Sequence, residues 1–307
     1  MSINSSSIGA SWFLDGISQL QKAEVRTQRQ ISSGYRIQDA SDSPTATPEL
    51  IGLGSSLAAS QAYQSNLDRV QAETTAADTA LSSGISLIES ARTLALQGAS
   101  STATATDRQN LAGQVQSIQQ QLIALANTTT EGRYIFGGDQ DLSPPYQANA
   151  AAPSGVTKLT AQTTTRVITD PSGQAVYQSA SASTIFDHSD AVGVARPDNA
   201  FVAVQSLVTA LQNNDASGTA AALTSLESAS SWLNQQQATY GVAGSRIATE
   251  QTEIASGITS LQTRISAIRD TDLVQAATDL AQENTAQSAA FAAQAQIPRK
   301  SLFDYLG

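Results

Sequence analysis

The stretch over residues 220–268 carries an apolar stripe that steps by three and four residues without a slip in phase. Such spacing puts every member on one face of an α-helix, in the manner of coiled-coil packing. The sequence therefore predicts one long helix here. Two shorter helices are the alternative, because Gly241 and Gly244 each cost about 1 kcal/mol in a helix interior. The stripe consists of Leu226, Ala229, Leu233, Gln236, Tyr240, Ala243, Ile247, Glu250, Ile254, Gly257, Leu261, Arg264 and Ile268.

This helix needs partners, because polar side chains interrupt its stripe. A second long helix is predicted from Ser43 or Thr47, each followed by proline, to about Ala99. After a polar break, Asp107 is expected to cap a third helix. Its stripe runs through Leu111, Val115, Ile118, Leu122, Leu125 and Thr129. The second and third helices predict an antiparallel pair, and the 220–268 helix would close it into a three-helix rod.

The periodicity changes at Glu131. The glycine-bounded segment 132–138 predicts a strand, and residues 166–169 and 174–177 flank a turn sequence, DPSG, that predicts a hairpin. Residues 139–198 are therefore expected to form a small β-rich insert. Helical pattern returns at Phe201, after a cap at Asp198 or Asn199.

Both ends of the chain predict amphipathic helices with incomplete stripes, which bury too little apolar area to be stable alone. We expect them to pair with each other and with copies from other subunits. The N-terminal stripe is Phe13, Ile17, Leu20, Glu24, Thr27 and Ile31. The C-terminal stripe is Leu273, Ala277, Leu280, Asn284, Gln287, Phe291 and Gln294.

Composition argues against several classes of function. A net charge of −10 leaves no basic surface for nucleic acid. Lys22, Arg26 and Arg29 share one helical face, which we interpret as a solvated face. No run is long and apolar enough to cross a membrane, and residues 1–20 lack the pattern of a Sec signal, so membrane insertion is not expected.

The sequence offers little for catalysis or metal binding. It has no cysteine, and His188 is its one histidine. The cluster DHSD at residues 187–190 is predicted to be a solvated loop, because a catalytic triad is built by convergence in space rather than by neighbours in sequence. We therefore expect no catalytic residue, no cofactor and no metal site.

Several segments resemble bacterial flagellins and their hook-associated relatives. ISSGYRI at residues 31–37 and DASDSP at 39–44 resemble the segment that joins the first two helices of that superfamily. DTAL at 78–81, LALQGA at 94–99, and residues 240–247 and 268–280 are also similar to it. The resemblance covers the chain up to Gly138 and from about Asp198 to its end, in the order typical of the family.

Two segments are more specific within this superfamily. TEGRYIFGG at 130–138 and SLFDYL at 301–306 resemble the hook-associated members that join the hook to the filament. QAQIP at 294–298 is closer to a flagellin tail. A short flagellin that forms the filament itself therefore stays open as an alternative, and another type III-secreted coiled-coil protein is the third.

The resemblance implies a mainly α protein, with a coiled-coil-like helical rod formed by the N- and C-terminal halves and a β-rich insert between them. Residues 1–42 and 270–307 would form a terminal coiled-coil domain, 43–138 and 199–269 the rod, and 139–198 an outer domain. The implied function is structural and not enzymatic: junction of hook and filament, after export through the flagellar type III channel to the extracellular flagellum. Implied partners are copies of the chain itself, a neighbouring hook-associated protein, flagellin and an export chaperone. The residues expected to make assembly contacts are Ile17, Leu20, Ile31, Leu273, Leu280, Phe291, Leu302, Phe303, Tyr305 and Leu306.

Overall fold

The computed structural model describes residues 4–160, 165–170 and 173–296, and it is mainly α-helical. Its long helices are α1 (Asn4–Ser33), α2 (Thr47–Ala99), α3 (Ala105–Ala126), α5 (Ala200–Gln212), α6 (Ala216–Arg269) and α7 (Leu273–Gln296). The chain divides into two compact units. The terminal unit comprises Met1–Ala62 and Ser256–Gly307, and the central unit comprises Tyr63–Ala255. Both boundaries fall inside helices, within α2 and α6.

The predicted long helix is confirmed as α6, a single helix of 54 residues with no break at Gly241 or Gly244. Its stripe is fully buried at Leu226, Leu233 and Ile247 in the central unit. The burial weakens further along, where Ile254 is only half-buried. The stripe therefore marks the core side of this helix through most of the central unit.

The second and third helices also form, with one change at the start of α3. The cap is Thr104, whose side chain accepts a hydrogen bond from the Asp107 amide at 3.2 Å. Asp107 instead occupies the third helical position, and its carboxylate accepts the Thr104 amide at 3.0 Å. The prediction of Asp107 as the cap was wrong, because a threonine three residues before an acid forms a reciprocal capping box.

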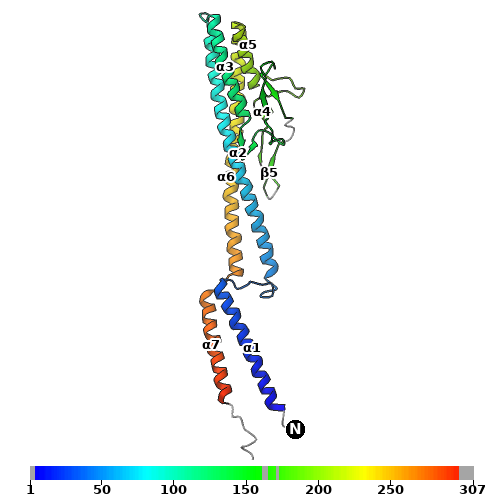
Figure 1. The fold of residues 1–307 in the computed structure, drawn as a ribbon, viewed down its shortest axis with the longest axis vertical. Helices are drawn as coiled ribbons and strands as arrows, with labels where there is room; N and C mark the ends of the chain where they lie inside the picture. The colour runs from blue at the N-terminus through cyan, green and yellow to red at the C-terminus, as the bar shows by residue number, and fades with distance from the viewer. Residues whose placement is uncertain (1–3, 161–164, 171–172, 297–307) are drawn as a thin grey trace, which may run out of the picture. The chain divides into compact units, whose positions relative to one another are not determined.

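Four long helices, rather than the three predicted for the rod, contribute to the core in the described part of the central unit. Helix α5 starts after Asn199, which caps it as expected by accepting the Val202 amide at 3.0 Å. It lies alongside α3 (Figure 1). Apolar residues occur on more than one face of α5, so it must be covered on several sides. A Cβ atom at Gly98 would overlap Leu211, so this glycine permits the close approach of α2 and α5.

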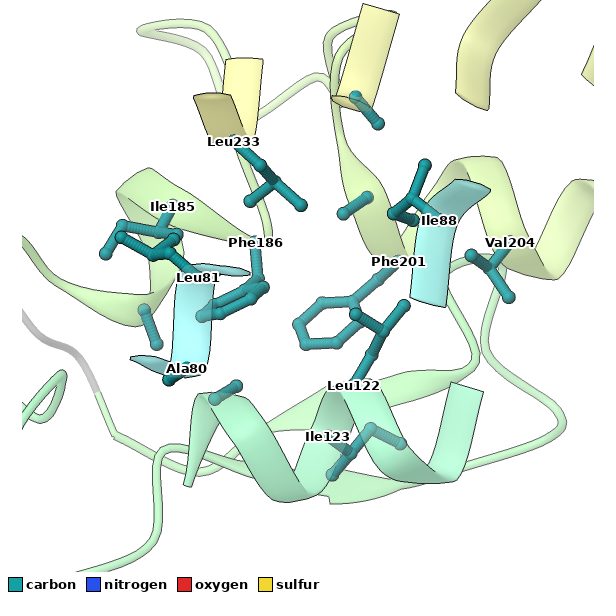
Figure 2. Close-up of a cluster of buried hydrophobic side chains, with 14 of the residues drawn as sticks. Ala80, Leu81, Ile88, Leu122, Ile123, Ile185, Phe186, Phe201, Val204 and Leu233 are labelled. Atoms are coloured by element: carbon teal, nitrogen blue, oxygen red, sulfur yellow. The ribbon is translucent and has the colours of Figure 1, made fainter. Parts of the chain in front are cut away.

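Aromatic rings from the insert and from the segment just before it complete this core. Phe186, which follows the short helix α4 (Ala182–Ile185), lies against Phe201 of α5 with ring centroids 6.0 Å apart. Figure 2 shows both rings among aliphatic side chains of α2, α3 and α6. Phe136 contacts Phe186 from another side, at 5.7 Å. The insert is therefore anchored in the helical core through its own large side chains.

The described residues between α3 and α5 form three separate two-stranded hairpins, of which the first lies just before the insert and the other two lie inside it. They pair β1 (Thr129–Thr130) with β2 (Arg133–Tyr134), β3 (Tyr146–Ala148) with β4 (Val156–Lys158), and β5 (Val167–Thr169) with β6 (Ala175–Gln178). The hairpin predicted around Asp170 is confirmed as β5–β6. The strand predicted over 132–138 covers only two of those residues. Glu131 and Gly132 form a turn with positive φ, and Phe136 is buried in the core instead of continuing the ladder.

A buried ion pair fastens the insert to α2. The Glu73 carboxylate of α2 is almost fully buried, and Arg166 of the insert reaches it at 2.5 Å. Burial raises the pKa of Glu73, and the positive charge of Arg166 partly opposes that shift. Asp141 lies 3.9 Å from Arg166 and 2.9 Å from the more exposed Arg133. The pair fixes where the β5–β6 hairpin lies on α2, because a buried carboxylate needs a partner.

We predict that Ile247→Asp lowers the free energy of unfolding by several kcal/mol, because it buries an unpaired carboxylate in the apolar core. Ala248→Asp places the same group on the exposed face of α6 and should cost below about 1 kcal/mol. Urea unfolding followed by circular dichroism measures both variants. Equal losses would show that the stripe does not define the buried face.

We predict that Arg166→Met lowers the free energy of unfolding by about 3 kcal/mol, because it leaves Glu73 buried without a cation. The folded variant would then hold a proton on Glu73 more tightly than the unfolded chain does. The loss should therefore shrink as the pH is lowered. Adding Glu73→Met should recover most of it, whereas Arg264→Met, at the exposed pair with Glu49, should cost below about 1 kcal/mol. A loss that is independent of pH and of residue 73 would contradict this account.

Candidate assembly surface

Helices α1 and α7 pack against each other in the terminal unit (Figure 1). Of their described side chains, those that become buried are Ile17 and Thr27 of α1 and Ala276 of α7. A helix pair with so few buried side chains gains little from burial compared with the entropy lost on ordering its residues. The pair is thus marginal as an isolated element.

The predicted stripe of α1 faces α7, since each of its members is buried or half-buried. The predicted stripe of α7 is wrong in phase: Ala277 and Asn284 are exposed. The inward face of α7 runs instead through Ala276, Asp279, Leu280, Glu283, Gln287 and Ala290. This face is poorer in apolar residues than the predicted one, so hydrophobic periodicity did not identify the side of α7 that packs against α1.

The predicted assembly residues lie in different surroundings. Ile17, Leu20, Ile31 and Leu280 are buried or half-buried between α1 and α7. Leu273 and Phe291 are each about half exposed, although the Phe291 ring meets Phe13 edge-on at 6.4 Å. Leu302, Phe303, Tyr305 and Leu306 lie outside the described residues. A role in assembly stays a prediction for all ten.

The outer surfaces of the helix pair carry further large apolar side chains. Trp12 is 77% exposed and Val274 is 78% exposed, and Leu14 and Val25 are also exposed. The predicted stripes missed these four residues because they fall outside the main helical phase. A search for a second apolar phase along each helix would have found them. Several exposed apolar side chains on one element mark a surface suited to contact with another protein.

One polar contact lies inside the α1–α7 seam. The Thr27 hydroxyl donates to one carboxylate oxygen of Glu283 at 3.2 Å. The other oxygen, Oε2, is buried and has no hydrogen-bond partner among the described residues. Because an unpaired buried acceptor is costly, the seam is incompletely satisfied in the single chain.

A backbone joint ties the end of α1 to the end of α6 within the terminal unit. The amides of Arg36 and Ile37 both donate to the Arg269 carbonyl, at 2.7 and 3.2 Å, and the Thr271 amide donates to the Gly34 carbonyl at 2.9 Å. Gly34 has a φ of 75°, a conformation that ends α1 and that glycine adopts without strain. The chain thus leaves α1 and meets the start of α7 along a short antiparallel contact.

Side chains reinforce this joint. The Arg36 guanidinium donates to the Ile268 carbonyl at 2.5 Å, which satisfies an acceptor at the end of α6. The Arg269 guanidinium lies 4.0 Å from the centre of the Tyr35 ring, in a cation–π contact. The joint is therefore held by backbone and side chains together.

The loop after the joint is held by the side chain of Asp42. One carboxylate oxygen of Asp42 accepts the amides of Gln38 and Asp39, each at 3.0 Å. These two hydrogen bonds hold the pKa of the Asp42 carboxyl below its ordinary value. Asp42 therefore closes the loop best in its charged form.

The cluster at 187–190, predicted to be a solvated loop, is partly structural. The His188 ring stacks on Trp232 of α6 with centroids 4.2 Å apart, and its Nδ1 lies 2.9 Å from Asp198. Asp187 accepts the Tyr146 hydroxyl at 2.9 Å. The solvated-loop prediction was wrong for His188 and Asp187, because His188 stacks on Trp232 and Asp187 accepts a hydrogen bond from the buried Tyr146 hydroxyl.

Across residues 4–160, 165–170 and 173–296, no three His, Cys, Asp or Glu side chains are grouped so that they could hold a metal ion. None of the helices over these ranges has the length and apolar character needed to cross a membrane.

Comparison with known proteins shows two family matches at the ends of the chain. Residues 5–141 match the bacterial flagellin N-terminal helical region, and residues 223–306 match the bacterial flagellin C-terminal helical region. The chain is 28% identical over 151 residues to flagellar hook-associated protein 3 of Salmonella typhimurium and 29% identical over 132 residues to that of Escherichia coli. The first match covers 48% of each protein, and the second covers 43% of this chain and 42% of the relative. The chain thus spans about half the length of the curated relatives it matches.

Solved structures share its fold. A flagellar hook-associated protein from Vibrio parahaemolyticus superposes with a TM-score of 0.64 at 18% identity, covering 75% of this chain and 100% of the other. FlgL of Bacillus cereus gives 0.56 at 18% identity, covering 70% and 100%.

The two flagellin matches lie in family order and together cover more than two thirds of the sequence. The chain therefore belongs to the bacterial flagellin superfamily, and within it is similar to hook-associated protein 3.

Proposed function

We propose that this chain is a structural protein of the bacterial flagellum that joins the hook to the flagellin filament. The observation that carries the proposal is that the helix pair α1–α7 leaves the side chains of Trp12 and Val274 exposed to solvent. These two helices lie in the segments that match the flagellin terminal regions. The names of both curated relatives, hook-associated protein 3, support the junction role over that of a filament subunit. Neighbouring partners would be another hook-associated protein on one side and flagellin on the other.

Assembly would complete the burial that the single chain lacks. Ile17 and Leu280 stabilise the helix pair from inside, whereas Leu273 and Phe291 remain about half exposed. Contact with copies of α1 and α7 removes such apolar surface from water, at about 25 cal/mol per Å². Leu20, Ile31 and the closing Leu302, Phe303, Tyr305 and Leu306 belong to the same proposed surface.

The joint prepares this surface for assembly. Because the Arg269 carbonyl accepts two amides and Arg36 caps α6, the end of α1 and the start of α7 are fixed together before any neighbour binds. Preorganisation of this kind lowers the entropy lost on association. The organisation we propose has a terminal coiled-coil domain of residues 1–42 and 270–307, a rod of 43–138 and 199–269, and an outer domain of 139–198.

Export fits the same role. We propose that the chain leaves the cell unfolded through the flagellar type III channel, with an export chaperone, and acts in the extracellular flagellum. The cysteine-free sequence supports this, because such a chain forms no disulfide that would hinder threading or refolding. We propose no catalytic activity.

The location of the protein tests the junction role. Val192 is 84% exposed in the insert, and the parent chain has no cysteine, so Val192→Cys can be labelled with a maleimide dye at one position. We expect one labelled focus where hook and filament meet. The cysteine-free parent, treated with the same dye, is the control. Dye along the whole filament would identify a short flagellin instead.

We predict that Asp42→Asn loosens the loop next to the joint. In the parent, the two hydrogen bonds lower the pKa of Asp42, so their contribution is complete above the ordinary aspartate pKa of about 3.9 and is lost as the pH falls through the lower folded value. Hydrogen-exchange protection of the Gln38 and Asp39 amides should fall in the variant at neutral pH, and in the parent only in acid. Asp39→Asn is the matched control and should leave both amides protected. Unchanged protection in Asp42→Asn would contradict this role.

A further inference from the structure

A small cavity lies in the central unit where α3, α5 and the β3–β4 hairpin meet. Its volume is about 290 Å³. That is near the lower end of the range for small-molecule sites in proteins, about 300–1,000 Å³. The other described wall residues are small or apolar, and none of the described side chains that line the cavity is charged. Five side chains of one type dominate its walls, namely Gln116, Gln119, Gln120, Gln205 and Gln212.

These glutamines come from two neighbouring helices. On α3, residues 116, 119 and 120 are three and four positions apart, so they share one face with Ile123. On α5, residues 205 and 212 are two helical turns apart and also share one face. Because α3 and α5 pack side by side, the two helices bring their side-chain amides to the same cavity.

Gln119 is the most deeply buried of the five. Its side chain lines the cavity although the residue is only 6% exposed. The side-chain nitrogen Nε2 donates to the Ser154 carbonyl of the hairpin at 3.0 Å. The oxygen Oε1 has no donor among the described residues, and it is not sealed off from solvent. Gln119 therefore presents an acceptor that only a molecule inside the cavity can satisfy.

Gly155 allows the hairpin to close over these amides. Its φ is 71°, and a Cβ atom there would overlap Nε2 of Gln119 and lie 2.6 Å from Oε1 of Gln205. The loop before it is tied by its own backbone, since the Gly155 amide donates to the Ala152 carbonyl at 2.9 Å and the Asn149 amide donates to the Gly155 carbonyl at 2.8 Å. The hairpin thus forms a preorganised wall of the cavity.

We infer that this cavity binds one neutral sugar ring, either as a free hexose or as the end residue of a carbohydrate chain. A primary amide holds an acceptor oxygen beside a donor nitrogen, which matches two neighbouring hydroxyl groups of a sugar. Ile123 and the methyl groups of Ala148 and Ala150 offer apolar surface to the C–H groups of the ring. The site goes beyond the junction role and does not depend on it, because the helix pair α1–α7 belongs to the other compact unit.

The lining of the cavity fits other classes of ligand less well. An anion calls for a cationic partner and a divalent metal ion for carboxylates, and the described wall residues provide neither. A purely apolar molecule would leave the buried amide of Gln119 without an acceptor's partner, which is costly. A peptide segment requires a longer groove than a cavity of this volume provides.

Binding of a hexose to the full-length, ¹⁵N-labelled chain tests the inference. A ligand of about twelve non-hydrogen atoms, at the efficiency typical of drug-sized molecules, has a Kd of about 2 mM. Glucose, galactose and mannose are therefore each titrated to about 50 mM while the side-chain amide signals are followed by NMR. We expect at least one hexose to shift the amide signals of Gln119 and Gln205 with a saturating curve. Glycerol at the same concentrations is the control for an additive without a sugar ring and should give no saturating shift.

Variants locate the binding in the cavity. Gln205→Leu keeps the size of a half-buried side chain that bonds to no described residue, so the fold should be retained, as circular dichroism verifies. Loss of its amide should raise the Kd about tenfold or more. Gln116→Leu, at the exposed rim, replaces it if that variant is unfolded. Gln121→Leu removes an exposed glutamine of α3 outside the cavity and should leave the Kd unchanged.

The methyl glycoside of the bound hexose identifies the source of the ligand. Retained binding indicates the end of a carbohydrate chain, and lost binding indicates the free sugar; both results support the site.

Four results would overturn the inference. They are no shift with any hexose, a glycerol effect as strong as that of a hexose, equal Kd values for the parent and for both Gln205→Leu and Gln116→Leu, and tighter binding of a glutamine-containing tetrapeptide than of any hexose.

Discussion

Burial of interrupted helical stripes is the constraint on which both compact units depend. In the central unit the stripes of α2, α3 and α6 are covered, because α5 and the rings of Phe186 and Phe201 fill the space between them. Among the described residues of the terminal unit, α7 is the one helix that packs along α1, and a polar contact between Thr27 and Glu283 occupies part of the seam. The same kind of interrupted apolar stripe is thus buried in a core in the central unit, whereas in the terminal unit it leaves apolar side chains exposed.

The insert is attached to the helices by two kinds of interaction that do different work. Phe186 supplies apolar area, which is favourable in many orientations. The ion pair between Glu73 and Arg166 is directional, and a buried carboxylate without its partner is costly. Area therefore gives this contact its strength, and the ion pair selects its geometry.

Much of this fold could be predicted from the sequence. The long helix α6, the hairpin around Asp170 and the cap at Asn199 follow from local rules of periodicity and turn chemistry. The failures arise where a local signal competes with tertiary structure. Asp107 has a side chain suited to capping, but Thr104 is the residue that caps α3. Phe136 was predicted in a strand, but its side chain is buried in the core.

The assembly surface was predictable in a more limited way. The α1 stripe was found because Ile17 and Thr27 keep phase with their neighbours. The inward face of α7 was missed because it contains Asp279 and Glu283, which hydrophobic periodicity counts as outward. Trp12 and Val274 were missed because exposure on a completed helix pair cannot be read from one stripe. The hydrophobic periodicity thus identified α1 and α7 as the assembly helices, but it did not identify all the residues on their surfaces.

The chain contains two tryptophans, one in each compact unit, and their surroundings differ sharply. Trp12 of the terminal unit is mostly in water, whereas Trp232 of the central unit is stacked on the His188 ring and donates its indole N–H to the Thr184 carbonyl. The two rings should therefore emit at different wavelengths without any added dye. The intrinsic fluorescence therefore distinguishes two events. A blue shift of the Trp12 emission reports that α1 has gained a neighbour, and a change in the Trp232 emission reports on the insert.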